Sequence, residues 1–146
     1  MPFDTLFRAA NALALCGWLA LIVLPRRPWL RTASLAGLVG GLCVAYAALV
    51  HTFFFAVPGG GFGSLQAVQT LFTAPGVALA GWLHYLAFDL FVGWWIAGRA
   101  DEAGVSRWLQ APVLATTFLF GPVGLLLAGA GLAALRARHR LTGAAP

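Results

Sequence analysis

The sequence contains no lysine, and only 9% of its 146 residues are charged. Soluble domains carry roughly 25% charged and about 45–50% apolar residues. This chain is instead 61% hydrophobic, with a mean hydropathy of +0.88. Such a composition excludes an ordinary water-soluble fold and predicts an integral membrane protein. The missing lysine is also a hint of a GC-rich bacterial genome, and hence of a bacterial inner membrane.

The basic residues are all arginines, and none of them lies deep inside a long apolar run. Charge confined to loops and ends suits contact with membrane lipid, whose headgroups include anionic ones. Nucleic-acid binding would require a basic stripe on a folded soluble face, so we predict no nucleic-acid partner. The nine residues are Arg8, Arg26, Arg27, Arg31, Arg99, Arg107, Arg136, Arg138 and Arg140.

Cysteine is also scarce, because only Cys16 and Cys43 occur and each lies in an apolar run. Neither their spacing nor their setting indicates a disulfide framework or a zinc site. The sequence contains no nicotinamide or flavin motif. We therefore predict no cofactor.

Four apolar segments have the length of about 20 residues that a membrane-spanning helix needs. They cover roughly residues 6–24, 33–57, 75–98 and 112–135. Short connections predict an all-α fold, a four-helix transmembrane bundle that forms a single domain over residues 1–146. Both termini would then lie on one face of the membrane. Pro122 has no N–H to continue a helix, so the fourth span should be kinked there.

The connection between the second and third spans begins PGGGFG and continues SLQAVQTLF. Leu65, Val68 and Leu71 recur at helical spacing, with Gln66 and Gln69 on the opposite side. This pattern predicts a short interfacial helix over residues 64–73, on the membrane surface or over the mouth of the bundle.

Several polar side chains fall inside the predicted spans. Counted from the same face, His51 and His84 lie at depths of about 9 and 14 Å, and Asn11 lies near their level. We therefore expect the two histidines to line one cavity that opens toward the glycine-rich connection. Asp89 lies about 21 Å deep, one helical turn after Tyr85 and on the same helix face.

Asp89 needs a physical reason to lie in an apolar run. A charged aspartate that faces lipid costs at least about 2.5–3.5 kcal/mol. We therefore expect Asp89 to face the protein interior, either protonated or next to a hydrogen-bond donor. Purely structural roles stay open, because His51, His84 and Asp89 could each bridge two helices by a hydrogen bond.

Three strings, GGGFGSLQAVQTLF, GWLHYLAFDLFVGWWI and FLFGPVGLL, occur in this order within residues 51–127. Together they resemble the neoxanthin-synthase-like family, the relatives of the plant abscisic-acid-deficiency membrane protein. The resemblance implies a four-helix membrane protein whose plant members are linked to conversion of the epoxide violaxanthin to the allenic neoxanthin. In this sequence Trp94 stands where an arginine is common in the family, which points away from violaxanthin itself as the substrate.

The resemblance and the polar residues suggest a membrane-embedded isomerase of a carotenoid or other isoprenoid. Opening an epoxide to an allene is redox-neutral, because an acid protonates the oxygen while a base removes a carbon-bound proton. Asp89 is the candidate acid, and His84 or His51 is the candidate base. The residues expected to bind the substrate are Tyr85, Trp82, Phe62, Gln66, Gln69 and Asn11.

Two other classes of function stay open at this point. The chain could be a non-catalytic bundle that binds or scaffolds lipids or carotenoids. Alternatively, His51 and His84 could be the axial ligands of a haem, or together with Asp89 could hold iron. Assembly into a homo-oligomer is compatible with each of these functions.

Overall fold

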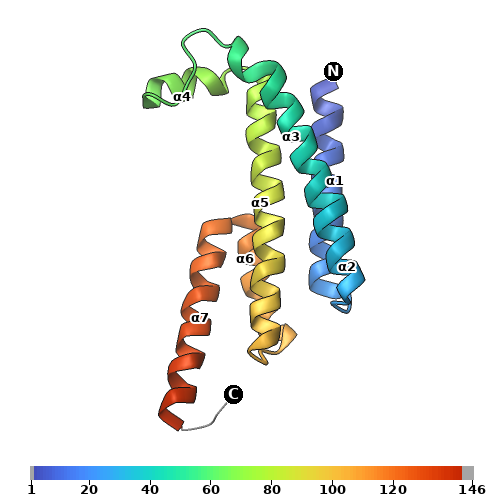
Figure 1. The fold of residues 1–146 in the computed structure, drawn as a ribbon, viewed down its shortest axis with the longest axis vertical. Coiled ribbons are helices and arrows are strands. Elements are labelled where there is room, and N and C mark those ends of the chain that lie inside the picture. The colour runs from blue at the N-terminus through green and yellow to red at the C-terminus, as the bar shows by residue number, and fades with distance from the viewer. Residues whose placement is uncertain (1, 143–146) are drawn as a thin grey trace. The chain divides into compact units, whose positions relative to one another are not determined.

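The structure, a computed structural model, describes residues 2–142, and every regular element within them is helical, which confirms the all-α prediction. Figure 1 labels the helices along the chain. In chain order the elements are α1 (Pro2–Val23), α2 (Pro28–Thr32), the π-helical stretch η1 (Ala33–Val39), α3 (Gly40–Phe53), the 3₁₀ turn η2 (Phe54–Ala56), α4 (Leu65–Phe72), α5 (Pro75–Glu102), α6 (Arg107–Leu119) and α7 (Gly121–Thr142).

Among the described residues, three helices are long and apolar enough to cross a membrane. They are Phe3–Val23, Pro28–Ala56 and Pro75–Glu102, and they coincide with the first three predicted spans. The second is assembled from α2, η1, α3 and η2, which follow one another without a gap.

The fourth predicted span, residues 112–135, is not one helix. α6 ends at Leu119, and Phe120 leaves the helical conformation with φ −145° and ψ 67°. α7 begins at Gly121 and runs back antiparallel to α6, so the two form a hairpin (Figure 1). The prediction of a kinked helix was wrong because Pro122 stands in the first turn of a new helix, where no N–H is needed. The count of four spans is therefore not confirmed: the described residues contain three candidate spans and the α6–α7 hairpin.

The chain divides into two compact units. Residues 2–17 and 27–88 form the first unit, and residues 18–26 and 89–142 form the second. α5 runs through both units, since residues 75–88 belong to the first and residues 89–102 to the second. The single-domain expectation stays a prediction.

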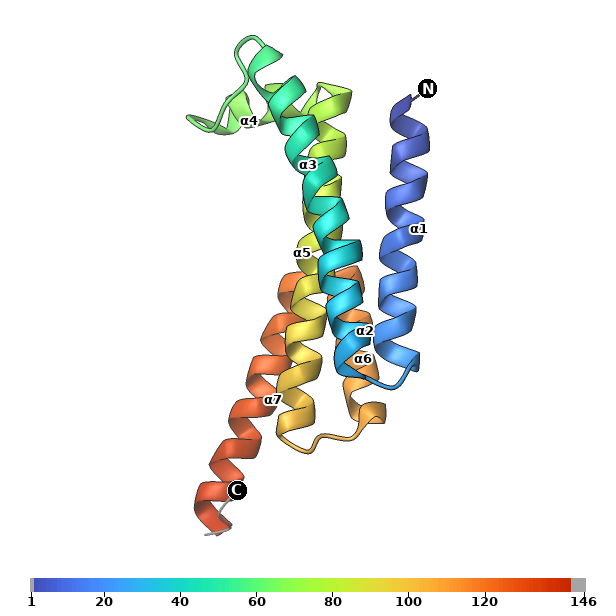
Figure 2. The same cartoon turned by 45° about the vertical axis from the view of Figure 1, so that its right-hand side comes forward.

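In the first unit, α4 is the short helix predicted for residues 64–73. Its N-cap is Ser64, whose Oγ accepts a hydrogen bond from the backbone N–H of Ala67 at 3.1 Å. Both views show α4 lying crosswise to α3 and α5, beside the end of α3 and the start of α5 (Figures 1 and 2). Leu71 is its buried side chain. The location of α4 at a membrane surface stays a prediction.

The second unit has its own apolar core, to which α1, α5 and α6 contribute. Its fully buried side chains include Leu21, Leu90 and Leu114. The rings of Trp18 and Phe118 meet edge to face, with centroids 5.6 Å apart. Thus the end of α1 packs within the same core as α6.

Candidate functional site

The first unit contains a groove of about 540 Å³, formed by α3, α4, α5 and the glycine-rich connection. Pockets for small molecules typically have volumes of about 300–1,000 Å³ and mostly apolar walls. Close packing shapes this groove at Gly81, where an added β-carbon would lie 2.6 Å from the ring of Phe72. The aromatic side chains that line it are Tyr46, Phe54, Phe62, Phe72, Trp82, His84 and Tyr85.

His84 is held in this groove by aromatic neighbours. Its imidazole stacks on Phe88 with ring centroids 4.4 Å apart, and the ring of Tyr46 lies 5.5 Å away. Within residues 2–142, no hydrogen bond fixes the imidazole nitrogens. The ring is therefore positioned by packing, while its nitrogens can bond to a ligand.

Trp82 and Tyr85 form a second wall of the groove, with ring centroids 5.3 Å apart. The indole N–H of Trp82 donates to Oδ1 of Asn11 at 3.2 Å. The amide nitrogen of Asn11 in turn donates to the carbonyl oxygen of Phe7 at 2.7 Å. Asn11 thus lies outside the groove lining and orients Trp82, rather than facing the groove itself.

Besides Asn11, three residues of the first unit that were named from the sequence do not line the groove. His51, Gln66 and Gln69 are all exposed. This groove is therefore not a cavity that His84 shares with His51. The expectation for His51 was based on its depth along the helix, but the direction of a side chain around the helix decides whether it lines the groove. Tyr46, Val50 and Phe54, four residues apart, line it. His51 follows Val50 and is turned about 100° away.

Asp89 belongs to the second unit, where its side chain is buried with 9% exposure. Its carboxyl group lies directly against Gly121, so that an added β-carbon there would overlap it. Gly121 is the first residue of α7, and the start of a helix carries the positive end of the helix dipole. The acidic side chain thus lies at the turn of the α6–α7 hairpin. It faces the protein interior, as expected from the cost of exposing an aspartate to lipid.

Trp94 is also part of the second unit and is 2% exposed. Its indole N–H is buried without a hydrogen-bond partner in the described part of the chain. The resemblance drawn from the sequence implied an arginine at this position, whereas the tryptophan fills the space with an apolar ring.

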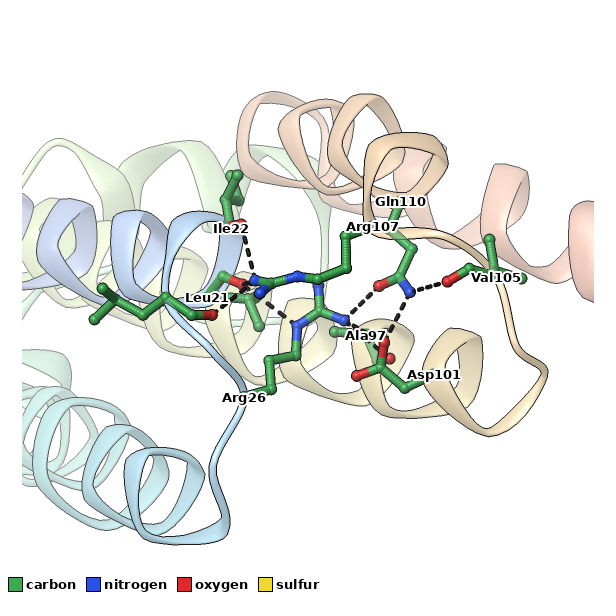
Figure 3. Close-up of polar contacts among 9 residues, drawn as sticks. Leu21, Ile22, Arg26, Ala97, Asp101, Val105, Arg107 and Gln110 are labelled. Atoms are coloured by element: carbon green, nitrogen blue, oxygen red, sulfur yellow. Dashed lines mark hydrogen bonds and ion pairs between the residues drawn. The ribbon is translucent and has the colours of Figure 1, made fainter.

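Sequence reasoning missed a polar cluster in the second unit, shown in Figure 3. Nη1 of Arg26 bonds to Oδ1 of Asp101 at 2.7 Å and also to Oε1 of Gln110. The Gln110 amide donates to Asp101 at 2.8 Å and to the carbonyl of Val105 at 2.7 Å. Arg26 is nearly buried here, with 9% side-chain exposure.

Arg107 completes this cluster at the end of α1. Its Nη2 donates to the carbonyl oxygens of Leu21, Ile22 and Leu24 at 3.2, 2.9 and 2.7 Å (Figure 3). The last carbonyls of a helix have no intrahelical partner, and a cation near them is favourable. Two arginines that the sequence placed against lipid headgroups are instead bound within the protein. The available signal was Asp101, an acid that lies between Arg99 and Arg107 in the sequence, in the last turn of α5.

The metal alternatives gain no support from the arrangement of these residues. In the described range, no group of three or more His, Cys, Asp or Glu side chains could hold a metal ion. Cys16 and Cys43 are both free. His51 and His84 do not meet in the groove, so its geometry offers no pair of axial haem ligands.

Long apolar helices with an aromatic groove define a helical protein of the membrane type. The family model described as ABA DEFICIENT 4-like matches residues 5–127, and the chain belongs to this family. This confirms the resemblance drawn from the three sequence strings. No curated protein and no solved structure matches the chain.

Proposed function

We propose that this protein is a multi-pass protein of a bacterial inner membrane that binds a carotenoid or other isoprenoid lipid. We further propose that it isomerises this lipid without net oxidation or reduction. The observation that supports the proposal most strongly is the groove in the first unit, whose aromatic wall includes His84. The isoprenoid would enter this groove from the bilayer. The surrounding membrane lipid would be the protein's other partner.

The groove suits one end of an isoprenoid. Its volume of about 540 Å³ is that of a site for a small molecule, so a long carotenoid would insert an end group and leave its chain among the lipids. Aromatic side chains give such a ring a large apolar contact area. His84 and Tyr85 offer a polar end group hydrogen bonds in an otherwise apolar setting.

The proposed chemistry needs one acid and one base. The acid protonates the epoxide oxygen as the carbon–oxygen bond breaks, and the base takes a proton from a neighbouring carbon. The product keeps the elemental composition of the substrate, so no redox cofactor is required. His84, which lines the groove, is the proposed base. Asp89, the acid expected from the sequence, belongs to the second unit and does not line the groove, so its role as proton donor stays a separate proposal that the variant Asp89→Asn tests.

A second candidate function is binding without catalysis. Few polar groups line the groove, since only Tyr46, Trp82, His84 and Tyr85 carry polar side-chain atoms. The indole N–H of Trp82 is already bonded to Asn11. A site with so little polar chemistry also suits a protein that holds an isoprenoid and does not change it.

Turnover separates these two functions. The purified full-length protein in lipid nanodiscs would be incubated with an epoxide carotenoid and with its hydroxylated, epoxide-free counterpart. We expect a product of unchanged mass from the epoxide alone, identified by chromatography and mass spectrometry. His84→Gln should abolish this product while retaining binding, whereas His51→Gln, which alters an exposed histidine, should leave turnover intact. Binding without any product would favour the second candidate, and a product of changed mass would exclude isomerisation.

A further inference from the structure

The second unit contains a separate apolar groove of about 320 Å³ between α5, α6 and α7. Its lining is almost entirely aliphatic, and α7 contributes the small residues Ala128, Gly131 and Ala134. A β-carbon added at Gly131 would meet nothing within 4 Å. Small side chains on this face of α7 therefore leave open space that the helices themselves do not fill.

Only two polar side chains line this groove, Gln110 and Arg138. Gln110 is 2% exposed, and its amide already bonds to Arg26, Asp101 and Val105. Arg138 is the charged side chain of this lining, so the groove carries a positive charge at one of its edges. Arg138 lies where α7 passes from an apolar stretch into the basic segment RARHR.

We propose that this groove binds an anionic phospholipid of the surrounding membrane. One acyl chain would occupy the aliphatic slot, and the phosphate would pair with Arg138. The charge of the site favours this occupant, because a guanidinium binds phosphate in a planar, two-pronged arrangement. Basic pockets between membrane helices select anionic headgroups by the same chemistry.

Lipid titration tests the role of charge. The full-length protein in detergent would be titrated with fluorescent phosphatidylglycerol and with phosphatidylcholine of the same acyl chains. We expect phosphatidylglycerol to bind more tightly, and Arg138→Gln to weaken it about five-fold, the equivalent of one surface charge. Arg31→Gln removes an exposed arginine of the first unit and should not change the affinity. Equal affinity for the two lipids, or an unchanged affinity in Arg138→Gln, would overturn the proposal.

A groove-filling variant tests the acyl-chain slot. Gly131→Leu should fill the open space and reduce phosphatidylglycerol binding at least ten-fold, whereas Gly129→Leu adds the same side chain to α7 away from the groove. Circular dichroism would verify that both variants keep their helix content. Wild-type binding by Gly131→Leu would contradict the proposal. Displacement of phosphatidylglycerol by an equal concentration of inorganic phosphate would also contradict the proposal, because it would indicate a site for the anion alone. The occupant could instead be a second copy of the chain. A dimer that dissociates in Gly131→Leu but not on addition of phosphatidylglycerol would identify that copy and would also overturn the lipid proposal.

Discussion

The carboxyl group of Asp89 lies against the backbone of Gly121, at the first residue of α7. A side chain on residue 121 would occupy the space of the carboxyl oxygens. The acid of the sequence run WLHYLAFDLFVGWWI and the glycine of FGPVG are thus fitted to each other within the second unit. This contact explains why both strings carry a residue that a plain apolar helix would not need.

Gly121→Ala should destabilise the protein, because the new methyl group overlaps the buried Asp89 carboxyl. Overpacking of this kind costs about 1–3 kcal/mol. Gly129→Ala has open space around it and should be neutral or slightly stabilising, by up to about 1 kcal/mol. Denaturant unfolding in detergent would measure both. The cost of Gly121→Ala should shrink in an Asp89→Ala background, and an unchanged cost there would show that the carboxyl is not the obstacle.

Asp89→Asn should leave the free energy of unfolding within about 1 kcal/mol of the wild type, because asparagine keeps the shape of a neutral carboxyl. Any isomerase activity should be lost, since an amide cannot transfer the proton. Yield, melting and carotenoid turnover of this variant would be measured together. If Asp89 were half of a buried ion pair, the change should instead cost about 3–5 kcal/mol. A stable and fully active variant would leave Asp89 without a catalytic role.

Asp101→Asn should destabilise the second unit more than Glu102→Gln, the equivalent acid-to-amide change at the next residue. Asp101 neutralises the nearly buried Arg26, so its loss leaves a buried charge without its counter-ion, at a cost of about 1–3 kcal/mol. Glu102 pairs with Arg99 on the surface, where both side chains are exposed. Glu102→Gln should therefore cost less than about 1 kcal/mol. Equal melting temperatures for the two variants would argue against the cluster as a stabilising element.

The hairpin makes a prediction about membrane topology. α6 has 13 residues and is about 20 Å long, too short to cross a hydrocarbon core of about 30 Å. Reporter fusions at residue 104 and at the C-terminus should therefore report the same face of the membrane. A fusion at residue 62 should report the opposite face, because α5 lies between residues 62 and 104. Opposite signals from residue 104 and the C-terminus would instead support four spans, with both termini on the same face of the membrane.

Hydropathy and local pattern were sufficient to predict much of this fold. Three spans and the short helix α4 follow from apolar length and helical spacing. The fourth span was not confirmed as one helix, because a hydropathy window does not distinguish one helix from two that meet at Phe120. Pro122 gave the position of the break but not its size, since a proline is compatible with both a kink and a new helix start.

The residues that line the groove could be predicted only in part, because depth along a helix does not give the direction of a side chain around it. His84, Tyr85, Trp82 and Phe62 were named from the sequence and all line it. His51 was placed by depth alone, and its helical phase turns it away. The cluster around Arg26 could not be predicted, because it depends on contacts between segments about 75–86 residues apart in the chain.

A titration of carotenoid absorbance shows whether the groove in the first unit holds the isoprenoid. Ala78 lines this groove and is exposed, so Ala78→Phe should fill it without disturbing the core. Ala47 is an exposed residue of α3 outside the groove, and Ala47→Phe is the matched control. We expect a saturable spectral shift with the wild type and Ala47→Phe, and a loss of at least ten-fold in affinity with Ala78→Phe. Equal binding by all three proteins would show that the isoprenoid does not bind in this groove.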